Sequence, residues 1–151
     1  TEPTSAPGPN RIIKQVNYKG AKERAAQDLY KKGRQVFVTG KYKTSKKLFE
    51  RFLKRYHNHE LADNALYWLG ETAYAQSDWV KSLSRFQDVI IRYPEGNKLA
   101  GSMLKSALCY AQMGDKAYAV KVLTDVETLF PLERVAQIAR TRRMALSDGG
   151  L

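Results

Sequence analysis

The sequence predicts an all-α fold: a right-handed α-solenoid of three helical hairpins followed by a C-terminal capping helix. The main evidence is a spacing of 37 residues that recurs along the chain. Equivalent residues keep this spacing in five columns: Gly33/Gly70/Ala107, Gly40/Ser77/Gly114, Ser45/Ser82/Ala119, Phe49/Phe86/Leu123 and His57/Pro94/Pro131. Repeats of this length are typical of solenoids, in which neighbouring units stack and bury a continuous core.

Each repeat contains two apolar stretches of helical periodicity, separated by a short turn. Two helices approach closely only where their side chains are small, so Gly70 and Ser82 are expected where the helices of the second hairpin cross. Asp78 and Asp115 each precede a helix, where a carboxylate can accept hydrogen bonds from the free amides of the first turn. This pattern is typical of a helix-turn-helix repeat of the tetratricopeptide type.

The spacing also predicts where the helices and domains lie. The helices are expected at 21–38, 42–56, 60–75, 79–93, 98–113, 116–129 and 132–146. We expect residues 1–20 to be a Pro/Ser/Thr-rich linker and short leader, residues 21–146 the repeat domain, and residues 147–151 a tail. Because the chain begins within linker-like sequence, we expect it to be a piece of a longer protein.

Positive charge is concentrated in the first hairpin and its leader. Residues 1–56 contain 15 Lys/Arg and 4 Asp/Glu, whereas residues 57–151 contain 11 of each. The expected basic surface consists of Lys43, Lys47, Arg51, Lys54 and Arg55. A solvated outer face explains such a run, and so does a site for an acidic protein, phospholipid head groups or another polyanion. Nucleic acid is disfavoured because no DNA- or RNA-binding motif accompanies the charge.

The sequence does not indicate catalytic chemistry. His57 and His59 are the only histidines and Cys109 is the only cysteine, whereas a tetrahedral metal site needs three or four ligands. No glycine-rich phosphate loop and no G-x-S-x-G motif is present. We therefore expect no catalytic residues, no metal and no cofactor, and a buried, inert Cys109 thiol. The absence of an apolar run of about 20 residues predicts no membrane span.

A stack of hairpins presents a groove lined by the first helix of each pair, and we expect this groove to bind a peptide or helix of a partner protein. The expected groove residues are Gln27, Tyr30, Arg34, Phe37, Asn64, Tyr67, Glu71, Tyr74, Leu104, Leu108 and Gln112. The alternative is that some of the rings, Tyr74 above all, pack between neighbouring hairpins. Recognition by a carboxylate clamp is not expected, because the third helix offers Gly101, Leu104 and Leu108 to the groove.

One stretch carries a family resemblance. The run ADNALYWLGE at 62–71, followed by FQDV at 86–89 and RYP at 92–94, resembles the C-terminal tetratricopeptide domain of the Tol–Pal-associated YbgF/CpoB cell-division coordinator family. The resemblance covers roughly residues 25–145 and implies a periplasmic location and binding to a TolA-like or peptidoglycan-synthesis protein. The chain departs from the family pattern in having His57 in place of a proline, and Ser45 and Ser82 in place of alanines. Outer-membrane assembly lipoproteins of the BamD kind contain similar repeats.

Three functions are consistent with these observations. The first is a non-catalytic periplasmic adaptor for a protein segment, in which Tyr30→Ala or Tyr67→Ala should weaken partner binding with little loss of helicity. The second is a structural scaffold subunit of another envelope machine, for outer-membrane assembly or motility. The third is a binder of polyanions or acidic partners through the basic surface.

Overall fold

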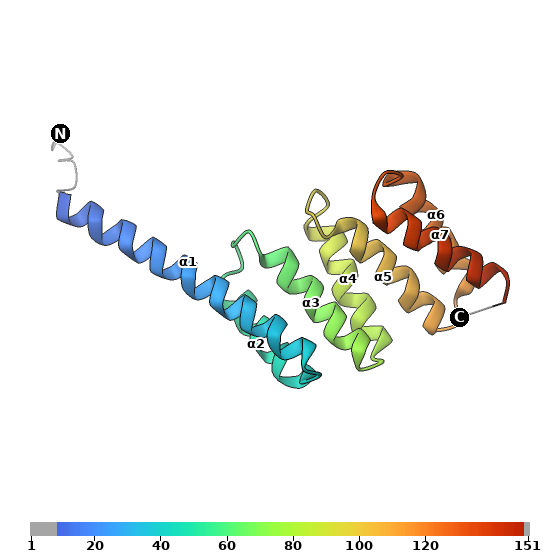
Figure 1. Ribbon diagram of the computed structural model, residues 1–151, viewed down its shortest axis with the longest axis horizontal. Coiled ribbons are helices and arrows are strands. Elements are labelled where there is room, and N and C mark those ends of the chain that lie inside the picture. The colour runs from blue at the N-terminus through green and yellow to red at the C-terminus, as the bar shows by residue number, and fades with distance from the viewer. Residues whose placement is uncertain (1–8, 150–151) are drawn as a thin grey trace.

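The computed structural model describes the backbone of residues 9–149 and the side chains of residues 19–149. This part of the chain contains seven helices and no strand: α1 (Pro9–Val38), α2 (Tyr42–Arg55), α3 (Ala62–Ala75), α4 (Trp79–Arg92), α5 (Leu99–Gln112), α6 (Lys116–Leu129) and α7 (Arg134–Ser147). They stack in chain order along the long axis of the molecule (Figure 1). The predicted all-α repeat fold is confirmed, and every helix after the first begins and ends within two residues of its expected position.

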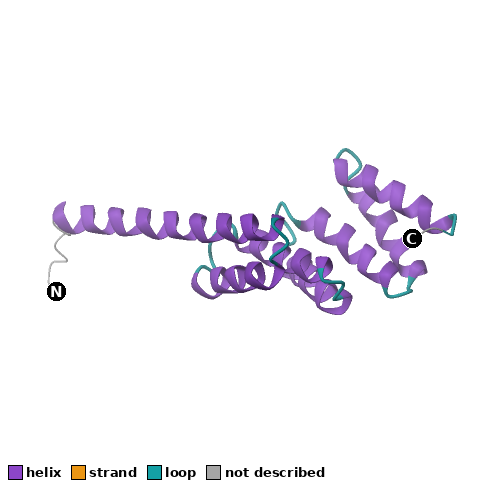
Figure 2. Cartoon of the chain, turned by 60° about the horizontal axis from the view of Figure 1, so that its bottom comes forward, coloured by secondary structure: helices purple, strands orange, loops and turns teal. Residues whose placement is uncertain are grey.

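The first helix differs from its expected position. It begins at Pro9 instead of residue 21, so residues 9–20, which were expected to precede the first helix, are helical. A proline is tolerated in the first turn because the amide that it lacks would have no partner within the helix. The N-terminal part of α1 extends beyond the other helices (Figure 2). Residues 1–8 of the expected linker and residues 150–151 of the expected tail lie outside the described residues, and the domain boundaries stay predictions.

The helices of the first two hairpins are joined at their crossing points by a buried hydrogen bond. Ser45 Oγ donates to the carbonyl oxygen of Gly33 over 2.9 Å. Ser82 Oγ donates to the carbonyl oxygen of Gly70, also over 2.9 Å. The expected close crossing at small residues is therefore confirmed, and the serine hydroxyl adds a bond that the equivalent Ala119 of the third hairpin cannot make.

The turns within the hairpins follow the predicted chemistry. Asp78 accepts a hydrogen bond from the backbone amide of Lys81, and Asp115 accepts one from the amide of Tyr118. Both aspartates therefore cap their helices as expected. The residue before the capping position, which is Gly40, Ser77 or Gly114 in the three hairpins, has a positive φ. Glycine adopts this conformation without strain, which explains why it recurs here, and Ser77 adopts it with a φ of 56°.

The core consists of two clusters of buried apolar side chains. The first joins α1, α2, α3 and α4 and includes Phe49, Phe52 and Leu66. The second joins α5, α6 and α7 and includes Leu123 and Leu146. Helix α7 thus covers the apolar side of the third hairpin, as expected of a cap.

Two further observations concern the described part of the chain. Cys109 is buried, as predicted, and its Sγ lies 3.4 Å from Ser82 Oγ. No helix among the described residues has the length and apolar content needed to cross a membrane.

Candidate functional site

The first helix of each hairpin and the cap form one side of the stack. In Figure 1, α1, α3, α5 and α7 follow one another along the long axis, with α4 drawn between α3 and α5. In addition, α1 contacts α3 and α5 contacts α7, so this is the side on which alternate helices approach one another. The side chains expected to form the groove come from α1, α3 and α5.

Three of the expected groove residues are buried, so they are not available to a partner. Tyr30 is 8% exposed, and its ring lies edge-on to Phe49 at 5.8 Å and to Phe52 at 6.0 Å between ring centroids. Its hydroxyl accepts a hydrogen bond of 2.9 Å from Trp68 Nε1. The ring therefore packs into its own hairpin and does not face the groove, so we expect Tyr30→Ala to destabilise the hairpin, and its effect on binding stays a prediction.

The other two buried residues are Asn64 and Leu104. Asn64 Nδ2 donates to Asp63 Oδ1 over 2.8 Å, which holds its amide within the α3 N-terminus. Leu104 belongs to the second core cluster. Periodicity placed these positions on the correct helices, but it did not distinguish the groove side from the adjoining buried side.

The exposed part of this surface is organised around three aromatic residues of α3. Tyr67 is half-buried, with its ring centroid 5.3 Å from that of Phe86. A Cβ added at Gly101 would lie 3.5 Å from the Tyr67 ring, so the ring packs directly on the backbone of α5. Burial raises the pKa of the Tyr67 hydroxyl, which stays protonated at physiological pH. Trp68 and Tyr74, also half-buried, complete the set.

Basic side chains from the neighbouring helices lie over each of the three rings. The Arg34 guanidinium of α1 is 5.2 Å from the Trp68 ring centroid. Lys98, the residue just before α5, places its Nζ 5.1 Å from the Tyr67 ring centroid. Lys105 Nζ of α5 lies 4.6 Å from the Tyr74 ring. Cations at these distances are attracted by the negative face of the ring.

We call this set of six residues the cation–aromatic face: Arg34, Tyr67, Trp68, Tyr74, Lys98 and Lys105. The carboxylate next to this face is that of Glu71. Its Oε1 forms an ion pair of 3.0 Å with Lys105 Nζ, but the angles at this contact are not those of a hydrogen bond. Burial raises the pKa of Tyr74, while the positive charge of Arg142 on α7 acts in the opposite direction. The face therefore carries more positive than negative charge.

Sequence reasoning missed three members of this face: Trp68, Lys98 and Lys105. Trp68 and Lys105 are 37 residues apart and occupy one column, which lies one residue beyond the column of Tyr67 and Leu104. In the structure, the side chains of this column reach back to the preceding repeat, and the sequence pattern within one hairpin does not show that contact.

The remaining expected groove residues surround this face. The Phe37 ring packs on Trp68 and Tyr42, with centroids 5.1 and 5.2 Å apart. Gln27 donates a hydrogen bond to Glu23, Leu108 is half-buried, and Gln112 is exposed. The structure thus assembles Arg34, Phe37, Tyr67, Glu71 and Tyr74 into one surface, and the role of that surface in binding stays a prediction.

The expected basic surface forms a separate region. Its five residues are all exposed and project from α2, away from the buried Ser45, Leu48, Phe49 and Phe52 of the same helix. The Arg55 guanidinium also lies over the Tyr56 ring, 5.8 Å from its centroid. Groove residues and basic residues therefore do not form a single site.

Both nitrogens of His59 are used within the protein. Nδ1 accepts a hydrogen bond from the amide of Leu61, which assigns the ring proton to Nε2, 3.1 Å from both carboxylate oxygens of Glu23. Among residues 19–149, no three His, Cys, Asp or Glu side chains are grouped closely enough to hold a metal ion.

Comparison with known families supports this description of the repeats. Residues 64–96 and 102–132 match the model of the tetratricopeptide repeat, and they correspond to the second and third hairpins. These two hairpins are therefore similar to tetratricopeptide repeats. Comparison with curated proteins gives no significant match.

Several solved structures share the fold. The type III secretion chaperone SycD of Yersinia enterocolitica, solved with a peptide of the translocator YopD, superimposes with a TM-score of 0.70 at 17% identity, over 83% of this chain and 92% of SycD. PcrH from Pseudomonas aeruginosa gives 0.69 at 16% identity, over 84% and 92% of the two chains. A thermophilic tetratricopeptide protein of Thermus thermophilus gives 0.67 at 24% identity, over 82% and 66%.

Proposed function

We propose that this chain is a non-catalytic interaction module that binds a segment of a partner protein along the cation–aromatic face. The observation that carries the proposal is the convergence of three cations, from α1, from α5 and from Lys98 just before α5, on three rings of α3. Aromatic and arginine side chains are enriched in protein interfaces and supply most of the binding energy there. Packing already holds the rings in place, so a partner loses little binding energy to ordering them.

The solved complexes of similar proteins support a segment as the ligand. SycD was solved with a peptide of YopD, and PcrH was also solved with the chaperone-binding region of PopB. Those ligands belong to those proteins, and the identity between the chains is low. The two complexes support the general mode of binding proposed here, in which a stack of hairpins holds a short segment of another protein.

The charge of the face favours a partner segment that contains carboxylates. Neither Arg34 nor Lys98 has a carboxylate oxygen within 4.0 Å among the described residues. Each cation already lies over a ring, so an arriving carboxylate meets a positive charge that is partly shielded from water. Such charge-assisted contacts are stronger than neutral hydrogen bonds.

A pair of charge-reversal variants tests the proposal. Arg34→Glu/Lys98→Glu alters the cation–aromatic face, while the control Lys43→Glu/Lys47→Glu changes the net charge equally on the outer side of α2. Immobilised protein is incubated with cell-envelope extract, captured proteins are quantified, and their affinities are then measured with purified partner. We expect the control to retain a partner whose affinity falls at least about tenfold in the first variant. Equal retention by both variants would refute the proposal.

The finer assignment concerns the cell envelope. We propose a periplasmic adaptor that binds a TolA-like or peptidoglycan-synthesis protein, and its support is the resemblance of residues 62–71 to the YbgF/CpoB family. Fractionation of cells that express the natural full-length gene tests the location. Titration with the purified periplasmic part of a TolA-like protein tests the partner, and no binding at high micromolar concentration would exclude it.

A specific observation favours a second candidate, an acidic partner or polyanion on the basic surface. Residues 19–55 contain 13 Lys/Arg and 3 Asp/Glu. In that range, Lys46 alone of the Lys and Arg side chains forms an ion pair with a described residue, at 3.7 Å from Glu50. Binding of this kind releases counterions, so the affinity for heparin should fall steeply with salt and should be lost in Lys43→Glu/Lys47→Glu.

A further inference from the structure

Two hollows on the opposite side of the stack occupy equivalent places in consecutive repeats. The first, of about 260 Å³, lies between α2 and α4 with α3 as its floor. The second, of about 420 Å³, lies between α4 and α6 with α5 as its floor. Their lining residues on α3 and α5 are on the helix faces opposite to the cation–aromatic face, so this side is independent of the function proposed above.

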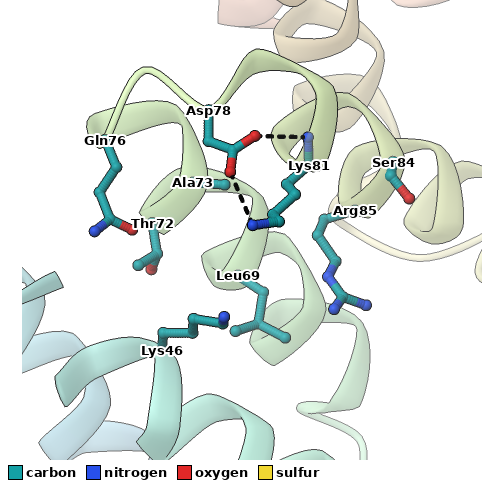
Figure 3. Close-up of a pocket in the computed structure, with 9 residues that line it drawn as sticks. All are labelled: Lys46, Leu69, Thr72, Ala73, Gln76, Asp78, Lys81, Ser84 and Arg85. Carbon is teal, nitrogen blue, oxygen red and sulfur yellow. Dashed lines mark hydrogen bonds and ion pairs between the residues drawn. The ribbon is translucent and has the colours of Figure 1, made fainter. Parts of the chain in front are cut away.

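The first hollow is cationic. Lys46 enters it from α2, and Lys81 and Arg85 enter it from α4 (Figure 3). The carboxylate that lines it is Asp78, whose Oδ2 lies 3.2 Å from Lys81 Nζ while Oδ1 caps α4. Lys46 and Arg85 have carboxylates only at 3.7 and 3.9 Å, from residues Glu50 and Asp88 of their own helices.

The second hollow is apolar. Ile91 of α4 is 75% exposed and Tyr118 of α6 is 43% exposed, and both line it together with Met103 and Val122. Ser106 also lines the hollow, at 4% exposure, and its hydroxyl has no hydrogen-bond partner among the described residues. Large apolar side chains lie at the mouth of this hollow, where the first hollow has charged ones.

The contrast is clearest at positions related by the repeat. Lys81 in the first hollow corresponds to Tyr118 in the second, and Arg85 corresponds to Val122. If this outer surface only had to face water, both hollows would be expected to have polar linings like that of the first hollow. Helix α4 instead separates a cationic hollow from an apolar one. Clustered exposed apolar side chains beside charged residues are typical of interaction sites.

We infer that an acidic–apolar segment of a partner protein docks across α4, with carboxylates in the cationic hollow and apolar side chains in the other. Both hollows are bordered by α4, and a helix of four turns is about 22 Å long, so one short helix laid across α4 can reach both. A second copy of this chain is disfavoured because each copy carries a net charge of +11. A membrane surface is disfavoured because a protein enters a bilayer with side chains that protrude from its surface. The two hollows are recessed and can instead receive the side chains of a partner.

The test uses two synthetic helical peptides with a fluorescent label. One has glutamates on its first two turns and leucines on its last two, and the other has lysines in place of the glutamates. Fluorescence anisotropy gives the affinity of the full chain for each peptide. The variants are Arg85→Glu and Ile91→Asp, both at solvent-accessible positions. Their controls are Arg134→Glu, with the same charge change at an exposed position of α7, and Val38→Asp, at an apolar position that is 78% exposed. A further variant, Arg34→Glu, reports whether the peptide binds to the cation–aromatic face instead.

We expect the glutamate peptide to bind and the lysine peptide not to bind. Arg85→Glu and Ile91→Asp should each weaken the affinity at least about tenfold, while both controls keep it and circular dichroism shows unchanged helicity. The inference is overturned if neither peptide binds, if both bind equally, or if Arg34→Glu alone weakens binding. It is also overturned if Ile91→Asp dissolves a dimer seen in sedimentation, or if the site proves to bind phosphatidylglycerol vesicles and not the peptide.

Discussion

The ring of Phe86 lies against the backbone of Gly70, so closely that a Cβ added at Gly70 would come within 2.7 Å of a ring carbon. The first hairpin repeats this contact between Gly33 and Phe49, where the corresponding distance is 2.9 Å. In the third hairpin both partners differ, since that column pairs Ala107 with Leu123. A larger residue on the first helix thus occurs together with a smaller one on the second.

This relationship predicts how Gly70→Ala behaves. The methyl group would overlap the Phe86 ring, and overpacking of this kind costs about 1–3 kcal/mol, more than the gain in helix propensity of about 1 kcal/mol. We expect a lower free energy of unfolding in urea for Gly70→Ala, and partial recovery in Gly70→Ala/Phe86→Leu, which reproduces the third hairpin. A single variant that is as stable as the parent would show that the ring moves aside without cost.

A second prediction concerns the missing helix cap of the first hairpin. Lys41, Asp78 and Asp115 are repeat-equivalent, with φ/ψ values of −84/61, −86/75 and −87/69°, but Lys41 makes no side-chain cap bond. Because the backbone is already in the capping conformation, Lys41→Asp should stabilise the protein by about 1 kcal/mol. Thermal unfolding measures the gain, and Lys41→Ala separates it from the loss of a positive charge. Equal stability of the two variants would contradict the prediction.

The third prediction separates the two contributions of Tyr30. Tyr30→Phe removes the hydrogen bond to Trp68 Nε1 and should cost about 1 kcal/mol, with a change in tryptophan fluorescence. Tyr30→Ala also leaves a cavity beside Phe49 and Phe52 and should cost about 3–5 kcal/mol. Urea unfolding measures both costs. Similar stability of the alanine variant and the parent would mean that the ring is not part of the core.

The fourth prediction concerns the attachment of α7 at low pH. Arg143 donates hydrogen bonds of 2.6 and 3.3 Å to the Glu127 carboxylate, and Arg140 donates one of 3.3 Å. The bonds from Arg143 and then Arg140 lower the pKa of Glu127 in the folded protein. The stabilisation is therefore fully present above the unfolded pKa of about 4.3 and is lost as the pH falls through the lower folded value.

Glu127→Gln should accordingly reduce the difference in Tm between pH 7 and pH 2.5. The matched control is Glu95→Gln, because Glu95 is exposed and has no basic group within 4.0 Å among the described residues. If Glu127→Gln and Glu95→Gln changed the acid sensitivity equally, the ion pairs between α6 and α7 would have no specific role.

The candidate site was less predictable than the fold. Arg34, Tyr67 and Tyr74 were identified from their place on the first helix of each hairpin, and the structure brings all three to one surface. Tyr30 was expected beside them because it is equivalent to Tyr67. Its environment differs, since the Trp68 indole covers it, whereas the position equivalent to Trp68 in the next repeat is Lys105. Contacts between repeats decide such differences, and they depend on two residues far apart in the sequence.

The sequence by itself determined the repeat, the positions of the hairpin helices and the turn chemistry. Each of these depends on residues that are close in the chain, such as Asp78 and the amide of Lys81. Only the tertiary structure decided which aromatic rings are buried and where cations meet them. It also showed that the two outer hollows beside α4 differ in chemistry. These features arise when neighbouring hairpins stack, because side chains from helices about 37 residues apart then share one environment.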